Sequence, residues 1–193
     1  MTTWLRPLSK FSLGRWVAGW LAAVGVLGFC VPVRAQAHRH FELTLAGLRP
    51  GVSRLSGALR RFGPRWSHPS GDEHDIYQWY DARRRLAISV EVSREGIVRY
   101  VTVWRHRLAL ASTVLPPGSA RTGLGLRLGQ SPARARALYG PPFFSGPSVL
   151  DRRQVLYVSF KFSWAGADKP QVLECSFNAA HRLIKMTLSA DYY

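Results

Sequence analysis

The sequence predicts an α+β protein of two tandem repeats, each a short helix packed on an antiparallel three- to four-stranded meander sheet, after an N-terminal signal helix. Three observations favour this fold: a block that recurs about 78 residues later, a Gly-Pro stop after each block, and alternating apolar residues after each stop. We expect the first repeat in residues 38–107, a linker in 108–121 and the second repeat in 122–193. The pattern leaves open whether the two sheets merge.

The N-terminal residues 1–37 have the order of a secretory signal peptide. Basic residues without acids come first, an apolar run covers residues 16–33, and Ala35–Ala37 supplies the small residues of a cleavage site. We therefore expect a periplasmic or secreted protein whose mature chain begins at His38. Two alternatives stay open: residues 16–33 remain and associate the protein with a membrane, since the run is long enough to span a bilayer, or the lipobox-like sequence ending at Cys30 is lipidated.

The excess of positive charge belongs to the expected mature chain. The full sequence has 27 Lys and Arg against 11 Asp and Glu, a net charge of +16. Residues 1–37 hold four of the basic residues and no acid, so their removal leaves 23 basic against 11 acidic residues, a net charge of +12. This charge favours an acidic protein or an anionic envelope component as partner, with nucleic acid less favoured. The alternative interpretation is that the scattered arginines only make the protein soluble and bind no partner.

Each repeat should open with a short capped helix. Residues 48–53 recur as residues 126–131, and the serines that end these blocks, Ser53 and Ser131, are good N-caps because a serine oxygen accepts a hydrogen bond from a free backbone N–H. An aromatic-Gly-Pro sequence then ends each helix, because glycine tolerates a positive φ and proline prevents continuation. The expected helices cover residues 54–61 and 132–138.

A polar, proline-containing loop and then three strands should follow each helix. The loops are expected at residues 65–75 and 142–153, and alternation of apolar residues predicts the strands. Cys175 falls on the apolar side of its strand, which indicates a packed thiol rather than a nucleophile. The expected strands are residues 76–80, 86–92 and 97–104, and then 155–162, 172–177 and 183–188.

The Gly-x-Ser start, the aromatic-Gly-Pro stop and the aromatic-rich strands resemble two known families. These are the SmpA/OmlA-type small lipoproteins of the bacterial outer-membrane barrel-assembly machinery and the tandem halves of β-lactamase inhibitor protein. The resemblance covers most of residues 44–190. It implies a binding scaffold without a catalytic centre, which contacts protein partners through its sheet face and loops.

Aromatic residues on the expected strands supply the candidate binding surface. Most of them, including Trp79, Trp104 and Phe160, are expected in the core, whereas three tyrosines point the opposite way. A half-exposed tyrosine beside a cationic side chain is a common recognition element, although ordinary sheet decoration is the alternative. The candidate binding residues are Tyr80, Arg83, Arg99, Tyr100, Tyr157 and Lys161.

One loop concentrates imidazoles and carboxylates, and His68, Asp72 and His74 are its weak metal-ligand candidates. Their spacing matches no zinc or calcium template, so solvated loop residues are the competing interpretation and we expect no metal or cofactor. No Gly-x-Ser-x-Gly or His-Glu-x-x-His pattern occurs. The sequence therefore predicts an exported, non-enzymatic binding or scaffold module of the bacterial cell envelope. The alternatives are a membrane-anchored envelope structural protein and a nucleic-acid or polyanion binder.

Overall fold

The computed structural model describes residues 43–64, 75–105, 113–162 and 170–190. All of these residues belong to one compact unit, His38–Tyr193. The expectations for the signal sequence, including residues 16–33, therefore lie outside the described residues. Among the residues that the structure describes, no helix is long and apolar enough to cross a membrane.

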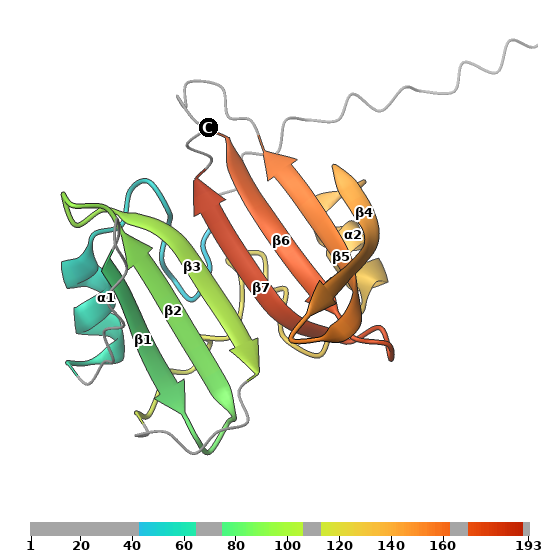
Figure 1. Cartoon of the computed structure of the whole chain (residues 1–193). Coiled ribbons are helices and arrows are strands. Elements are labelled where there is room, and N and C mark those ends of the chain that lie inside the picture. Colours follow the sequence, from blue (N-terminus) through green and yellow to red (C-terminus); the bar gives the residue numbers. More distant parts are fainter. Residues whose placement is uncertain (1–42, 65–74, 106–112, 163–169, 191–193) are drawn as a thin grey trace, which may run out of the picture. The chain divides into compact units, whose positions relative to one another are not determined.

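Seven antiparallel strands form one sheet in the order β1-β2-β3-β7-β6-β5-β4 (Figure 1). Each strand pairs with its neighbour in the chain, except where β3 meets β7 in the middle of the sheet. The strands are β1 (Asp75–Asp81), β2 (Leu86–Val92), β3 (Val98–Arg105), β4 (Phe144–Leu150), β5 (Arg153–Phe162), β6 (Gln171–Phe177) and β7 (Leu183–Ala190).

The prediction of two tandem repeats, each a short helix on its own meander sheet, is wrong. Strand β3 pairs directly with β7, with Tyr100 opposite Ser189, so the strands join in a single seven-stranded sheet. Only two short helices accompany it in the described residues, α1 (Leu55–Phe62) and α2 (Pro132–Tyr139). The physical reason is that two separate meanders would leave β3 and β7 with unpaired edges, and pairing satisfies their backbone groups.

Strand β4 lies where the sequence predicts a loop, at residues 142–153. Gly146, Pro147 and the serines around them weaken the strand pattern, and the strand is mostly exposed. Proline is tolerated there because β4 is an edge strand that pairs with β5 alone. Asp151 and Arg152 both have positive φ, 49° and 61°, as the two central residues of a tight hairpin turn require. The usual Asn-Gly or Asp-Gly signal is absent from this turn.

The two helices begin differently. Ser131 caps α2 as predicted, because its side chain accepts a hydrogen bond of 3.3 Å from the backbone N–H of Arg134. The predicted cap at Ser53 is wrong, since Arg54 occupies the N-cap position of α1 and makes no side-chain cap. Ser53 Oγ instead accepts a hydrogen bond of 2.8 Å from the backbone N–H of Arg49 and so closes the preceding turn.

An aromatic residue fastens the end of each helix. Phe62 of α1 packs on Trp79 with ring centroids 5.1 Å apart, and Trp79 Nε1 donates a hydrogen bond of 3.1 Å to the carbonyl of Gly63. Tyr139 of α2 donates a hydrogen bond of 2.6 Å to Thr122 Oγ1. The two contacts give the aromatic-Gly-Pro sequence a similar role at the end of each helix. The sequence therefore recurs even though the strands form one sheet.

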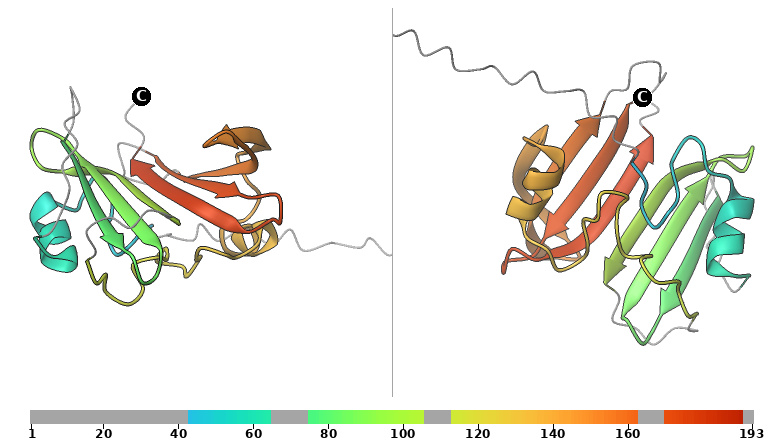
Figure 2. Two further views of the ribbon diagram at one scale, coloured as in Figure 1. Left: turned by 60° about the horizontal axis from the view of Figure 1, so that its bottom comes forward. Right: turned by 180° about the vertical axis from the view of Figure 1, so that it is seen from behind.

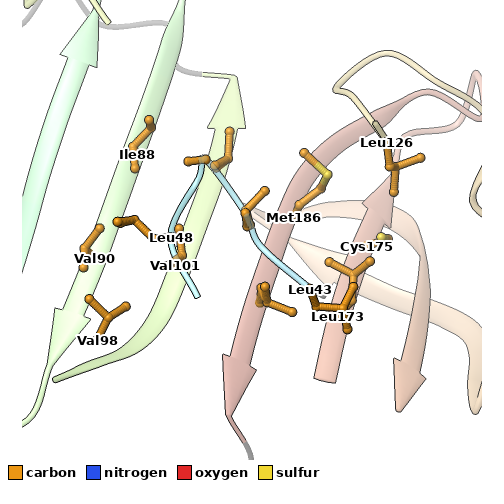
Figure 3. Packing of buried hydrophobic residues seen from close by; sticks show 14 of the residues in the cluster. Leu43, Leu48, Ile88, Val90, Val98, Val101, Leu126, Leu173, Cys175 and Met186 are labelled. Carbon is orange, nitrogen blue, oxygen red and sulfur yellow. The ribbon is translucent and has the colours of Figure 1, made fainter. Parts of the chain in front are cut away.

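The hydrophobic core lies on the face of the sheet that carries both helices (Figures 1 and 2). Leu43 and Leu48 precede α1 and pack in the same buried cluster as Val101 of β3 and Met186 of β7 (Figure 3). One core therefore spans the junction of β3 and β7. Cys175 is fully buried in this cluster as a free thiol, which confirms the prediction of a packed cysteine.

Candidate binding surface

The face of the sheet opposite the helices has no described helix or loop over it (Figures 1 and 2). Side chains alternate along a strand, so the residues that do not point into the core form this face. The register aligns them in three rows across β1, β2, β3, β7, β6 and β5, and we call these eighteen residues the open face. The rows are Ile76, Glu91, Tyr100, Ser189, Val172 and Lys161; Gln78, Ser89, Thr102, Thr187, Glu174 and Ser159; and Tyr80, Ala87, Trp104, Lys185, Ser176 and Tyr157.

Aromatic and hydroxyl side chains dominate the open face, and most of them are half-buried. Its formal charges balance, with Glu91 and Glu174 against Lys161 and Lys185, and none of the eighteen positions is an arginine. The large positive charge of the chain therefore lies elsewhere.

Polar contacts hold the side chains of the open face in place. Tyr157 donates a hydrogen bond of 2.6 Å to Glu174 Oε1, and Thr102 and Thr187 join their hydroxyls across β3 and β7 at 3.1 Å. Burial, and then the acceptor Glu174, raise the pKa of Tyr157 well above its usual value, so the phenol stays protonated and donates throughout the physiological range. At the other end of the face, the Tyr80 hydroxyl donates to Gln78 Oε1.

Two large aromatic residues flank one alanine at the β1 end of the open face. Tyr80 and Trp104 are the cross-strand neighbours of Ala87 on its two sides. Since adjacent strands are about 4.8 Å apart, the two backbones lie about 10 Å apart with only a methyl group between the rings. Such a pair offers rigid apolar area beside hydrogen-bonding groups.

The structure brings four of the six predicted binding residues to the open face and leaves two arginines off it. Arg83 lies in the exposed turn between β1 and β2. Arg99 lies at the irregularity where the register of β3 shifts, because Glu91 pairs with Tyr100 and Val92 with Val98. The four residues on the face are Tyr80, Tyr100, Tyr157 and Lys161. Of the three predicted cationic residues, the register therefore places Lys161 in the rows of the open face.

Trp104 also lies on the open face, so the prediction that it belongs to the core is wrong. It is half-buried on the open face, whereas its neighbours Val101 and Val103 are fully buried on the other side. The signal was present, because Trp104 is four positions after Tyr100 and residues an even number apart share one face of a strand.

The metal candidates His68, Asp72 and His74 lie outside the described residues. Within the described ranges, no group of three His, Cys, Asp or Glu side chains could hold a metal ion.

The fold and this surface define an antiparallel-sheet protein with one covered and one open face. No family model matches the sequence, and no curated protein matches it either. The crystal structure of YjgB, a DUF4309 family protein from Bacillus subtilis, is similar with a TM-score of 0.45 and 14% identity, over 75% of this chain and 83% of that chain. A likeness of this degree carries no argument about function.

Proposed function

We propose that this protein is an exported, non-enzymatic binding module of the bacterial cell envelope, and that its open face binds a protein partner. The observation that carries the proposal is the set of three in-register rows, in which tyrosine, tryptophan, serine and threonine take ten of the eighteen positions, on a face that no described element covers. The order of basic, apolar and small residues in 1–37 supports export.

The dimensions of the open face suit a protein rather than a small ligand. Six strands and five residues along each give an area about 24 Å by 17 Å before side chains are added. The product, about 400 Å² of projected backbone area, is about half of the ~800 Å² that one partner contributes to a standard protein interface, and the side chains that project from the sheet add contact area.

The tyrosines and the tryptophan of the open face are of the residue types that give most binding energy at interfaces. Tyrosine and tryptophan supply large contact area with few rotatable bonds, so little conformational entropy is lost on binding. Trp104 and Tyr157 lie in the same row, separated by Lys185 and Ser176. Because charges on the open face balance, we expect this partner surface to match by shape and hydrogen bonds more than by net charge.

Substitution of Trp104 and Tyr157 tests the proposal, with a protein partner captured from the cell envelope as the ligand. Trp104→Ala should weaken binding of this partner at least 10-fold, since truncation of a central aromatic residue at an interface removes about 2 kcal/mol or more. Tyr157→Phe keeps the ring and removes the hydrogen bond to Glu174, so it should have a smaller effect. Affinities are measured by titration of purified partner, and circular dichroism confirms that each variant folds.

Val114→Ser is the matched control, because Val114 is 78% exposed and lies outside the open face. Its affinity should stay within about 2-fold of the wild type, as expected for an apolar side chain away from an interface. Equal losses for Trp104→Ala and Val114→Ser, or no loss for Trp104→Ala, would contradict the proposal.

A further inference from the structure

Four arginines line a cleft of about 460 Å³ on the side of the sheet opposite the open face. They come from distant parts of the chain: Arg84 from the turn after β1, Arg105 from the end of β3, and Arg121 and Arg127 from the segment before α2. Pro117, Leu128 and their neighbours form the rest of the lining, which contains no carboxylate.

Arg84 is held in place by contacts within the protein. Its Nη1 donates a hydrogen bond of 2.8 Å to the carbonyl of Leu115, and its Nε lies 3.8 Å from Asp81 Oδ2. The buried Asp81 carboxylate also accepts hydrogen bonds from the backbone N–H groups of Arg84 at 3.0 Å and Leu115 at 3.3 Å. These contacts fix one wall of the cleft.

The other three guanidinium groups, those of Arg105, Arg121 and Arg127, have no hydrogen-bond or ion-pair partner among the described residues. Arg121 and Arg127 are also opposite each other in an isolated antiparallel bridge. Like charges directly opposite each other are destabilising. A bound anion would offset this repulsion.

The backbone makes room for this arrangement. Gly118 has a φ of +81°, and a Cβ atom at this position would lie 2.9 Å from Arg121 Nε. A side chain at residue 118 would therefore be strained and would displace Arg121. The side chain of Arg121 therefore packs against the backbone of Gly118 at the wall of the cleft.

The geometry points to a binding site in this cleft for a phosphate group, carried by a small molecule or by a lipid headgroup. The planar fork of arginine matches the oxygens of phosphate, which it binds by two parallel hydrogen bonds. The volume of about 460 Å³ lies within the ~300–1,000 Å³ of small-molecule sites and exceeds what one bare anion fills. The site is independent of the open face.

Titration of the full exported chain with inorganic pyrophosphate tests this site. The wild type should bind saturably with one site, and its thermal midpoint should rise by about 5 to 10 °C at 100 times Kd. The double variant Arg121→Gln/Arg127→Gln should lose at least 10-fold in affinity. Its unliganded thermal midpoint should not fall, because the repulsion is relieved, whereas loss of purely structural arginines would lower it.

The control is Arg134→Gln/Arg136→Gln, which removes two exposed arginines from α2 and so changes the net charge equally. Its affinity for pyrophosphate should stay within about 2-fold of the wild type at physiological salt, where distant exposed charges are screened. Equal losses for the two double variants would mean diffuse charge attraction and would overturn the proposal. Absence of saturable binding to the wild type would overturn it as well.

A vesicle flotation assay distinguishes the source of the phosphate, and a single variant replaces the double variant if that variant does not fold. Flotation with phosphatidylglycerol vesicles, using phosphatidylcholine vesicles as control, identifies a lipid headgroup if binding requires Arg121 and Arg127 and pyrophosphate competes. Pyrophosphate binding without such flotation identifies a soluble phosphate compound. If the double variant fails to fold, the single variant Arg105→Gln at the exposed end of β3 replaces it, and an unchanged pyrophosphate affinity would then refute the site.

Discussion

The hydroxyl of Tyr139 anchors α2 to the segment before it, and the effect of removing this hydroxyl should decrease as the pH rises. Tyr139 is 6% exposed, and its hydroxyl donates a 2.6 Å hydrogen bond to Thr122 Oγ1. Tyr139→Phe keeps the ring and deletes this bond. A buried hydrogen bond contributes about 1 kcal/mol, so the variant should be less stable than the wild type by about that amount at pH 7.

At alkaline pH the hydroxyl of Tyr139 stabilises the fold less than at pH 7. Burial raises the pKa of Tyr139 from 10.0 to about 12, against the opposing effect of the Thr122 hydrogen bond. The contribution of this hydroxyl to the free energy of unfolding is complete below pH 10 and is lost as the pH rises toward 12. The reason is that Tyr139 ionises at a lower pH in the unfolded chain than in the folded protein. Each pH unit in this window removes about 1.4 kcal/mol. At pH 11 the stability advantage of the wild type over Tyr139→Phe should therefore be smaller than at pH 7.

Urea unfolding of both proteins at pH 7 and pH 11, followed by tryptophan fluorescence, measures the difference. Groups that titrate in this range and do not interact with Tyr139 are common to both proteins and cancel in the comparison. An equal destabilisation of Tyr139→Phe at both pH values would refute the linkage between burial and ionisation at this residue.

Three further outcomes follow from the structure. Trp79→Phe deletes the hydrogen bond to the Gly63 carbonyl and part of a fully buried ring, so urea unfolding should show a loss of about 1–3 kcal/mol, more than Trp104→Phe on the half-buried open face. With Cys30→Ser, the remaining Cys175 thiol should resist a thiol reagent at pH 8 until urea unfolds the chain, because burial raises its pKa; rapid native labelling would argue against the packing. Intact-mass measurement of the exported protein should give a chain that starts at His38, and a mass retaining residues 16–33 would favour the membrane-anchored alternative.

The sequence predicts the parts of the fold that depend on local chemistry. Ser131 caps α2, and Gly63 and Gly140 end the two helices with φ of 87° and 84°, because capping and stopping involve neighbouring residues. The pairing of β3 with β7 joins residues far apart in the chain, as with Tyr100 and Ser189, and no local pattern records it. Strand β4 is missed because an exposed edge strand needs no apolar alternation.

The same contrast holds for the surfaces. Alternation along the strands predicts that Tyr80, Tyr100 and Tyr157 share one face, and the same alternation adds Trp104 to that face. The arginine cleft has no such signal. Arg84 and Arg127 are 43 positions apart, and only the tertiary fold makes them neighbours.

A photo-crosslinking amino acid at Ser176 tests most directly whether the open face binds a protein. Ser176 lies in the same row as Trp104 and Tyr157, and the exposed Ala133 of α2 provides the control position. We expect a discrete protein adduct in the envelope from Ser176, lost on Trp104→Ala, and none from Ala133. Adducts of equal yield from both positions, or an adduct from Ala133 alone, would contradict it.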